Sequence, residues 1–202
     1  MNRIITLGRE FGSGGRELGR RLSEKLGIAY YDQEIITEIA KRTALSVEYI
    51  HRIEDSVPVA SFPIHIGRTF FSMPNPVFQQ SINLFREQHK LISELAEKSD
   101  CLIVGRCADY ILAGRENTIN VFIHAPREAR VKRIMELNQI GEAEALKMLT
   151  NSDKERGNHY FRYTDQKWGK AQNYDVCINS SLMGVEKTAE MLADMARIEV
   201  RN

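Results

Sequence analysis

Short apolar runs alternate along the chain with segments whose apolar residues recur every three or four positions. Arg3–Leu7 is a short apolar run, and the segment after it carries Leu18, Leu22 and Leu26 before Gly27. A short apolar run predicts a buried strand, and a four-residue repeat that stops at glycine predicts a helix. The alternation continues, with strands predicted at 28–31, 101–104, 118–125 and 174–179, and helices from 32 or 33 onward and at 46–54, 77–98, 127–139, 142 to about 153 and 184–197.

Strands that alternate with helices are typical of an α/β protein. Each helix carries the chain back so that the next strand runs parallel to the last, and the buried apolar strands need cover on both sides. We therefore predict a parallel sheet of about five strands with helices on both faces. In such sheets ligands bind beyond the carboxyl ends of the strands, so residues that follow strands are the candidates for function.

Composition agrees with one folded domain. The chain has 202 residues, of which 43% are hydrophobic and 27% are charged, enough to bury a core. Lys and Arg total 28 against 27 Asp and Glu, so the overall charge does not favour a nucleic-acid partner. No apolar stretch is long enough to span a membrane, and no secretory signal pattern precedes the first strand, so we expect a cytoplasmic protein without a membrane partner. The charges leave the oligomeric state open.

Two further features of the composition bear on the fold. The cysteines Cys101, Cys107 and Cys177 lack the spacing of a zinc site or a disulfide framework, so we expect buried thiols. Prolines and phenylalanines gather in 56–76, which predicts an irregular apolar loop that either packs on itself, lines a pocket or forms an interface.

The clearest chemical signal is a run of glycines after the first strand. Gly8, Gly12, Gly14 and Gly15 lie in the segment that leads into the first helix. Glycine lets backbone N–H groups approach an anion closely, and the start of a helix adds positive potential. The segment therefore predicts a phosphate site, although a glycine turn that only joins strand to helix has the same composition.

Neither familiar nucleotide motif matches this segment to the letter. The dinucleotide motif G-x-G-x-x-G needs glycine or alanine where Glu17 stands. The P-loop G-x-x-x-x-G-K-[ST] fits in two registers, with Gly15 or Arg16 in place of the lysine, and its first glycine then falls on Arg9 or Glu10. In the second register a guanidinium replaces the lysine and the Glu17 carboxylate replaces the hydroxyl that meets Mg²⁺.

Three segments carry a resemblance to a known family. GREFGSGGRELGRRLSEKLGIAYYD, CLIVGRCADYIL and YDVCINSSLMGVEKTAEML resemble the cytidylate kinase-like family, a branch of the P-loop nucleoside monophosphate kinases. The resemblance spans most of the chain and includes the absence of the lysine. It implies a P-loop nucleoside triphosphate hydrolase-like three-layer fold over 1–202, a helical acceptor-binding insertion at about 33–98 and a lid at about 127–170.

The resemblance also implies the residues that bind ATP and Mg²⁺. Arg16 is expected to act in catalysis as well, and Glu17 is the candidate ligand of Mg²⁺, the expected cofactor. The residues expected to bind the ATP phosphates are Gly12, Ser13, Gly14, Gly15, Arg16 and Glu17.

The acceptor side is expected to involve residues after the second and third strands. Arg106 stands where the family carries an arginine that contacts the acceptor phosphate, and Asp109 is the displaced acid of that motif. Asp32 either holds the acceptor-phosphate arginine or a metal-bound water, or caps the next helix. Arg106 has an alternative as well, an ion pair at the sheet edge.

Arg130, Arg156 and Arg162 are the expected catalytic cations of the lid, with Asp153 orienting one of them. Spacing of three places Arg130 on one helix face with Arg127 and Arg133. A charged run of this kind is also typical of a solvated helix face. Trp168 either stacks on a base or packs beneath the lid.

These features predict an ATP-dependent phosphotransferase that converts a nucleoside monophosphate to its diphosphate. The resemblance alone favours CMP or dCMP as acceptor. The expected partners are ATP and a nucleoside monophosphate or a similar small acceptor. Two alternatives stay open, a kinase for another small metabolite and a regulatory protein that binds nucleotide without turnover.

Overall fold

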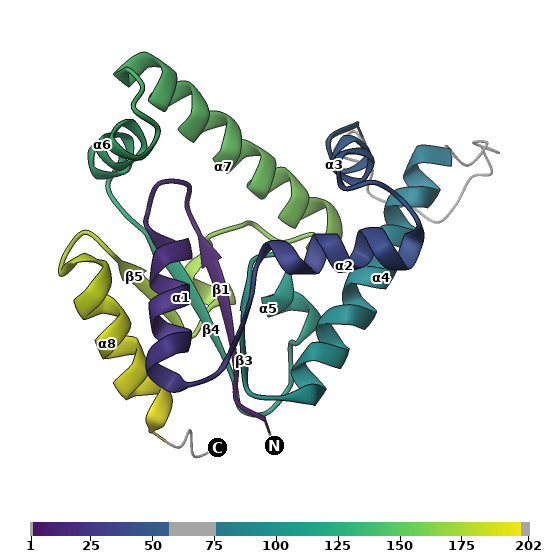
Figure 1. Ribbon diagram of the computed structural model, residues 1–202, viewed down its shortest axis with the longest axis horizontal. Helices are drawn as coiled ribbons and strands as arrows, with labels where there is room; N and C mark the ends of the chain where they lie inside the picture. Colours follow the sequence, from purple (N-terminus) through teal and green to yellow (C-terminus); the bar gives the residue numbers. More distant parts are fainter. Residues whose placement is uncertain (1, 57–75, 199–202) are drawn as a thin grey trace. The chain divides into compact units, whose positions relative to one another are not determined.

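The computed structural model describes residues 2–56 and 76–198. In this part of the chain five strands form a parallel sheet in the order β2-β3-β1-β4-β5 (Figure 1). The predicted α/β class and the sheet of about five parallel strands are confirmed. The strands are β1 (Ile4–Arg9), β2 (Ala29–Tyr31), β3 (Cys101–Val104), β4 (Thr118–His124) and β5 (Val176–Asn179).

The central strand β1 is longer than the sequence predicts. The predicted strand ends at Leu7, whereas β1 continues through Gly8 and Arg9, which pair with Phe122 and Ile123 of β4. A Cβ on Gly8 would stand 2.8 Å from Cδ2 of Phe122, so the Phe122 ring can pack here only because residue 8 has no side chain. The extension puts Arg9 at the last position of the central strand, where a ligand site is expected.

The helices follow the predicted ranges closely, with one clear exception. Helix α7 is predicted to end near Asp153 but continues as one helix to Thr164. The short elements α5 and η1, of four and three residues, are too short to show a periodic pattern. The helices are α1 (Gly15–Leu26), α2 (Gln33–Thr43), α3 (Val47–Ser56), α4 (Pro76–Lys98), α5 (Ala108–Ile111), α6 (Arg127–Asn138), α7 (Glu142–Thr164), η1 (Ala171–Asn173) and α8 (Gly184–Arg197).

The described residues form two compact units, 2–32 with 92–198, and 33–91. The smaller unit is helical, and the Tyr49 hydroxyl donates a hydrogen bond to Gln80 Oε1 (3.2 Å), which joins α3 to α4. Its acceptor-binding role stays a prediction. The buried side chains of α2 and α3 include Ile35, Ile36, Ile39, Ile50 and Ile53.

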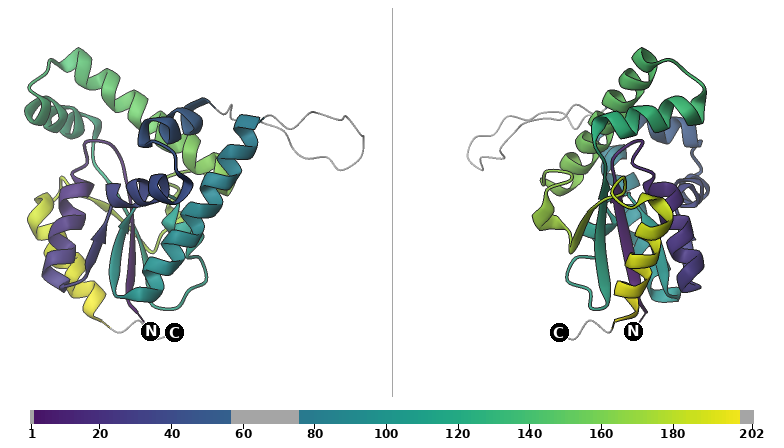
Figure 2. Two further views of the ribbon diagram at one scale, coloured as in Figure 1. Left: turned by 45° about the vertical axis from the view of Figure 1, so that its right-hand side comes forward. Right: turned by 90° about the vertical axis from the view of Figure 1, so that its left-hand side faces the viewer.

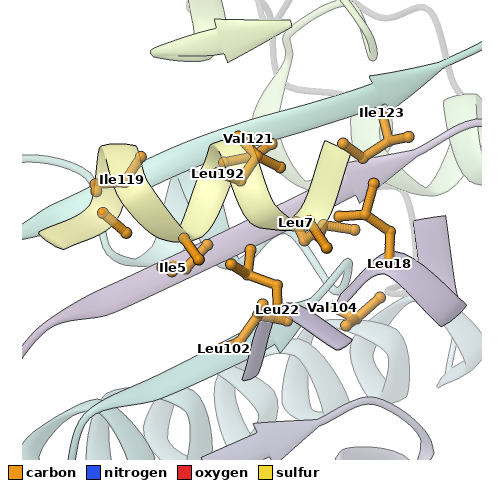
Figure 3. Close-up of a cluster of buried hydrophobic side chains, with 13 residues drawn as sticks. Ile5, Leu7, Leu18, Leu22, Leu102, Val104, Ile119, Val121, Ile123 and Leu192 are labelled. Carbon is orange, nitrogen blue, oxygen red and sulfur yellow. The ribbon is translucent and has the colours of Figure 1, made fainter. Parts of the chain in front are cut away.

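Helices α1 and α8 lie side by side on one face of the sheet (Figure 2). Their apolar residues meet those of β1, β3 and β4 in one cluster, drawn in Figure 3. Leu18 and Leu22 of α1 have no exposed surface, and burying such a side chain contributes about 1.5–3 kcal/mol, so the position of α1 is firmly set. Ile4 and Ile103 lie outside this cluster, on the opposite face, where α5 packs against β1.

Helices α6 and α7 form a second apolar cluster. Val131 and Ile134 of α6 pack with Ala145 and Leu149 of α7. Phe11, from the segment between β1 and α1, packs against the same cluster. The glycine-rich turn and the predicted lid are therefore in direct contact.

The prediction of buried thiols has a mixed outcome. Cys101 and Cys107 are buried as expected, but Cys177 is exposed because it lies on β5, at the edge of the sheet. Within residues 2–56 and 76–198, no helix has the length and apolarity needed to cross a membrane. The predicted Pro- and Phe-rich loop lies outside the described residues.

Candidate active site

The turn between β1 and α1 depends on two glycines in the left-handed conformation. Gly12 and Gly14 both have a φ of 78°, which glycine adopts without steric cost. The space beside them is also filled. A Cβ on Gly12 would stand 2.9 Å from the carbonyl oxygen of Arg130, and one on Gly14 would stand 2.9 Å from Val185 Cγ2. A side chain at either position would strain the turn and displace α6 or α8.

The turn delivers unsatisfied amides to one place. Gly14 is the N-cap of α1 and offers no side chain, and the first intrahelical hydrogen bond runs from Leu18 N–H to the Gly14 carbonyl (2.9 Å). The amides of Gly15, Arg16 and Glu17 precede that bond and lack intrahelical acceptors. An uncapped helix start after a glycine turn suits a phosphate group, as the sequence predicts.

Three polar contacts hold the turn in shape. The Ser13 hydroxyl donates to the Glu10 carbonyl oxygen (2.8 Å), and the Ser180 hydroxyl donates to the Ser13 carbonyl oxygen (2.5 Å). The Glu10 carboxylate accepts a hydrogen bond from the Ala125 amide (3.1 Å). These contacts tie the turn to the carboxyl ends of β4 and β5, so the Ser13 hydroxyl supports the loop.

Asp32 is bound by two arginines at the carboxyl end of the sheet. Its Oδ2 lies 2.6 Å from Arg16 Nε, and its Oδ1 lies 3.5 Å from Arg9 Nη2. The Arg16 side chain is 60% exposed, whereas that of Arg9 is 16% exposed. The structure therefore joins a predicted phosphate-binding residue, Arg16, to a predicted acceptor residue, Asp32. Asp32 thus forms ion pairs with Arg9 and Arg16, and its expected role at the acceptor phosphate stays a prediction.

Arg156 brings a third guanidinium to the same place. It donates a hydrogen bond to the Arg9 carbonyl oxygen (3.0 Å), and its Cζ lies 5.4 Å from the centroid of the Phe11 ring. Burial and the charge of Arg156 lower the pKa of Arg9 to about 10, against the opposing effect of Asp32. Burial likewise lowers the pKa of Arg156. Both side chains stay protonated near neutral pH, so positive charge accumulates.

Arg130 is surrounded by partners of opposite charge. Its Nη1 lies 2.5 Å from Asp153 Oδ2, and its Nε lies 3.3 Å from Glu10 Oε2. It also donates to the Phe11 carbonyl oxygen (3.2 Å), and the residue is 8% exposed. Asp153 thus orients Arg130, as the sequence predicts. With two carboxylates as partners, Arg130 joins the turn to α6 and α7.

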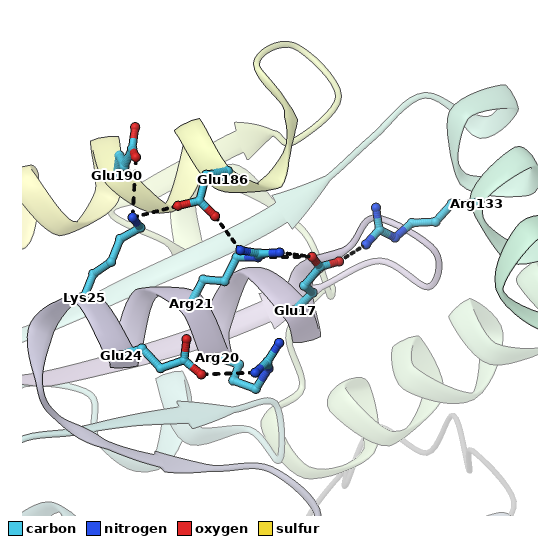
Figure 4. Close-up of polar contacts among 8 residues, drawn as sticks. All are labelled: Glu17, Arg20, Arg21, Glu24, Lys25, Arg133, Glu186 and Glu190. Atoms are coloured by element: carbon cyan, nitrogen blue, oxygen red, sulfur yellow. Dashed lines mark hydrogen bonds and ion pairs between the residues drawn. The ribbon is translucent and has the colours of Figure 1, made fainter.

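Glu17 lies in a network of ion pairs shown in Figure 4. Its carboxylate pairs with Arg21 (2.9 Å) and with Arg133 of α6. The hydrogen bond from Arg21, followed by the charge of Arg133, holds the pKa of Glu17 below its usual value. The Arg133 Cζ stands 3.1 Å from where a Cβ on Gly14 would be, so its guanidinium covers the glycine turn.

The residues around the turn do not fit a magnesium ion held by the protein alone. The carboxylate of Glu17, the predicted ligand, forms ion pairs with two arginines. In the part of the chain that the structure describes, no three His, Cys, Asp or Glu residues form a group that could hold a metal. In kinases Mg²⁺ is often held mainly by substrate phosphates and water, so these residues are compatible with a metal that arrives with the nucleotide.

The turn after β3 has an unusual backbone. Gly105, Arg106 and Cys107 follow one another with φ of 69°, 56° and 54°. Such a conformation costs about 1–3 kcal/mol for a residue other than glycine, and strain of this kind often lies at functional sites. The half-buried Arg106 stands at the expected acceptor position, beyond the carboxyl end of β3.

Asp109 accepts a hydrogen bond from the Tyr160 hydroxyl (2.7 Å), which ties α5 to α7. Burial raises the pKa of Asp109, and the bond from Tyr160 opposes that change.

Arg162 follows Arg156 by six residues on α7, which turns its side chain about 240° around the helix axis relative to that of Arg156. Trp168 packs edge-on against Phe122, with 5.4 Å between ring centroids.

Sequence reasoning missed several residues of this site. Arg9 appeared only as a mismatch to the P-loop pattern, and Arg133 only as a neighbour of Arg130 on one helix face. The mismatch was a signal in itself, because an arginine stands where the motif has its first glycine. Ser180 carried no such signal, since its contact with Ser13 depends on the packing of β5.

A parallel sheet with a glycine turn between its central strand and α1, and guanidinium groups beside that turn, defines a P-loop kinase fold. The model of the cytidylate kinase-like family matches residues 4–182, and the chain belongs to this family. It is thus an ATP-dependent phosphotransferase of the nucleoside monophosphate kinase type, as the sequence predicts.

Individual relatives agree with this class. Cytidylate kinases of Methanopyrus kandleri and Methanococcus aeolicus are each 23% identical to the chain, over 94% and 91% of its length and 90% and 91% of theirs. A crystal structure of an uncharacterized protein from Eubacterium ventriosum is 28% identical, with a TM-score of 0.72, over 98% of this chain and 99% of that one. Shikimate kinase from Bacteroides thetaiotaomicron, 14% identical with a TM-score of 0.57 over 97% and 99% of the two chains, shares the fold.

Proposed function

We propose that the protein transfers the γ-phosphoryl group of MgATP to a nucleoside monophosphate, with CMP or dCMP as preferred acceptor. The proposal is carried by three guanidinium groups beside the start of α1: Arg9 and Arg16 pair with Asp32, and Arg156 binds the Arg9 carbonyl oxygen. Phosphoryl transfer between nucleotides gathers several negative charges, and catalysis consists mainly of positioning them and offsetting their repulsion. A local excess of guanidinium groups serves that purpose.

The reaction requires no general base from the protein. An oxygen of the acceptor phosphate bonds to the γ-phosphorus, the bond from that phosphorus to the bridging oxygen breaks, and ADP leaves with the electron pair. The attacking oxygen is already anionic near neutral pH. A hydroxyl acceptor would instead need a base, and Asp32 would have to give up its ion pairs with Arg9 and Arg16 to take a proton. The site therefore favours a phosphate acceptor.

The site residues take the following roles in this proposal. The amides from Gly14 to Glu17 bind the ATP phosphates, Arg133 lies over them, and Arg106 binds the acceptor phosphate. Arg16 and Arg156 offset charge during transfer, whereas Arg130 braces the turn. The predicted roles of Asp109 and Arg162 stay predictions. The preference for cytidine rests on the family and on the two curated cytidylate kinases.

The test is ADP formation from MgATP with CMP, dCMP, UMP, AMP and GMP offered one at a time. We expect turnover with a cytidine acceptor, and loss of it in Arg16→Ala and Arg106→Ala. Turnover with another nucleotide alone would overturn the cytidine preference. Binding of MgATP without transfer to any acceptor would support the regulatory alternative or a different small acceptor.

A further inference from the structure

The space that a P-loop lysine would use is occupied by another residue. A Cβ on Gly15 would stand 2.6 Å from Cβ and 3.0 Å from Cγ of Arg9. Gly15 has an ordinary helical conformation at the first position of α1, so its backbone would accept a side chain. The side chain of Arg9 excludes one. Residue 9 and residue 15 therefore compete for the same space.

The Arg9 side chain continues from there across the carboxyl ends of the central strands. A Cβ on Gly105, directly after β3, would overlap Arg9 Nη1, and Nη2 lies 3.5 Å from Asp32 Oδ1. The guanidinium thus lies beyond the ends of β1 and β3, the position of ligand sites in parallel sheets. It also lies next to the start of α1, where the ATP phosphates are proposed to bind.

We propose that Arg9 is the catalytic cation of this P-loop and replaces the missing lysine by contacting the phosphoryl group that is transferred. This inference rests on the proposed function and assigns its central cation to β1 instead of α1. In the register with Gly15 at the lysine position, Arg9 stands at the first glycine of the motif. The cation and the glycine have exchanged places in the sequence while the charge stays beside the turn.

Arg9 stays charged despite its burial, and its neighbours orient it. Its pKa of about 10 leaves the guanidinium protonated near neutral pH. Arg156 binds its main-chain carbonyl, and Asp32 holds one side of the guanidinium. A planar guanidinium presents several N–H groups in fixed directions, so Arg9 can contact two phosphate oxygens at once, which a lysine ammonium does less well.

The first experiment compares the affinities of ATP and ADP by calorimetry, together with kcat, in wild type, Arg9→Gln and Arg9→Lys. We expect Arg9→Gln to lower kcat by about 10²–10³-fold, the usual effect of removing one donor to a transition state. The preference for ATP over ADP should fall about tenfold, because only ATP has the γ-phosphate. Arg9→Lys should retain more of the kcat and more of the ATP preference than Arg9→Gln does. Arg20→Gln is the matched control, because Arg20 is an exposed arginine of α1 that pairs with Glu24 (3.1 Å).

The second experiment moves the cation back to α1. Gly15→Lys alone should destabilise the protein, because its side chain would overlap that of Arg9. The double variant Arg9→Gly with Gly15→Lys should fold, and its kcat should exceed that of Arg9→Gly by at least about tenfold. The reason is that one ion-pair or hydrogen-bond contact to a charged group is restored. Thermal unfolding of each variant separates loss of folding from loss of contact.

The outcomes distinguish this inference from the proposed function. Wild-type kcat and an unchanged ATP preference in Arg9→Gln would overturn the role of Arg9 and leave the kinase in place. A second outcome is that wild type transfers phosphate to none of the acceptors, while Arg9→Gln loses the preference for ATP over ADP. That result would overturn the proposed reaction and support the contact between Arg9 and the γ-phosphate. A wild-type protein that does not bind ATP would overturn both.

Discussion

Two groups of arginines flank the glycine turn, and they differ in charge balance. In the balanced group, Arg130 and Arg133 meet the carboxylates of Glu10, Asp153 and Glu17. In the unbalanced group, Arg9 and Arg16 form ion pairs with the carboxylate of Asp32, and Arg156 donates a hydrogen bond to the Arg9 carbonyl oxygen while the charges of Asp153 and Asp32 act on it.

The difference in charge balance distinguishes arginines that stabilise the fold from arginines that are available to bind an anion. An arginine whose charge is matched by carboxylates stabilises the fold, because its removal leaves partly buried carboxylates without a counter-charge. Arginines that outnumber their carboxylates repel one another until an anion arrives. The comparison predicts different roles for Arg130 and Arg156, both expected as lid cations.

The largest expected effect comes from removing the centre of the balanced group. Arg130→Met leaves the carboxylates of Glu10 and Asp153 without their guanidinium. We expect the free energy of unfolding to fall by about 2–3 kcal/mol, since both carboxylates are partly exposed. For a chain of this length that lowers Tm by roughly 4–12 °C, measured by thermal unfolding.

The matched variant in the unbalanced group is Arg156→Met. It should lower kcat/KM by about 10²-fold while the free energy of unfolding falls by no more than about 1 kcal/mol. Equal losses of stability in the two variants would contradict the comparison.

The second prediction concerns the single acid of the unbalanced group. Asp32→Asn removes the carboxylate that competes with phosphate for Arg9 and Arg16. We expect inorganic pyrophosphate to bind about 3–10-fold more tightly at low salt, since an opposing charge is lost close to the site. Turnover should fall about tenfold, because the two guanidiniums lose their orientation.

Calorimetry with pyrophosphate measures the first effect. Glu190→Gln is the control, because it removes an exposed carboxylate that pairs with Lys25 of α1, and its pyrophosphate affinity should not rise. Weaker pyrophosphate binding in Asp32→Asn would show that Asp32 supports the anion site instead of competing with the anion.

The smallest expected effect is the pH dependence of the balanced group. Hydrogen bonds from Arg21 and the charge of Arg133 lower the pKa of Glu17 from 4.5, so the folded protein favours its ionised form. The added stability is present above pH 4.5 and is lost as the pH falls through the lowered pKa. Because the Glu17 side chain is 36% exposed, we expect less than about 1 kcal/mol.

Glu17→Gln should therefore flatten the decline of Tm between about pH 5 and pH 3 by one or two degrees. Glu24→Gln, which removes an exposed partner of Arg20 on the same helix, is the control. A decline as steep as in wild type would show that the ion pairs of Glu17 contribute nothing to acid stability.

The sequence predicted the sheet, the order of the main helices and the location of the glycine turn, because these follow from local patterns. The repeat of Leu18 and Leu22 defines the buried face of α1 without reference to the rest of the chain. The conformation of Gly12 and Gly14 is likewise a property of glycine. Helix α7 was predicted too short, because the polar residues after Asp153 hide its buried side, which carries Tyr160 and Thr164.

The partners of the arginines were decided only by the tertiary structure. Arg130 and Arg156 have the same chemistry, and no local pattern shows that one meets two carboxylates and the other the carbonyl of Arg9. The strand extension that makes Arg9 part of the site depends on pairing with β4. By itself the sequence determined the glycine turn at which phosphate is predicted to bind, since that backbone conformation is local. Which cations surround the phosphate depends on charges brought together from β1, α1 and α7, and only folding brings them into range.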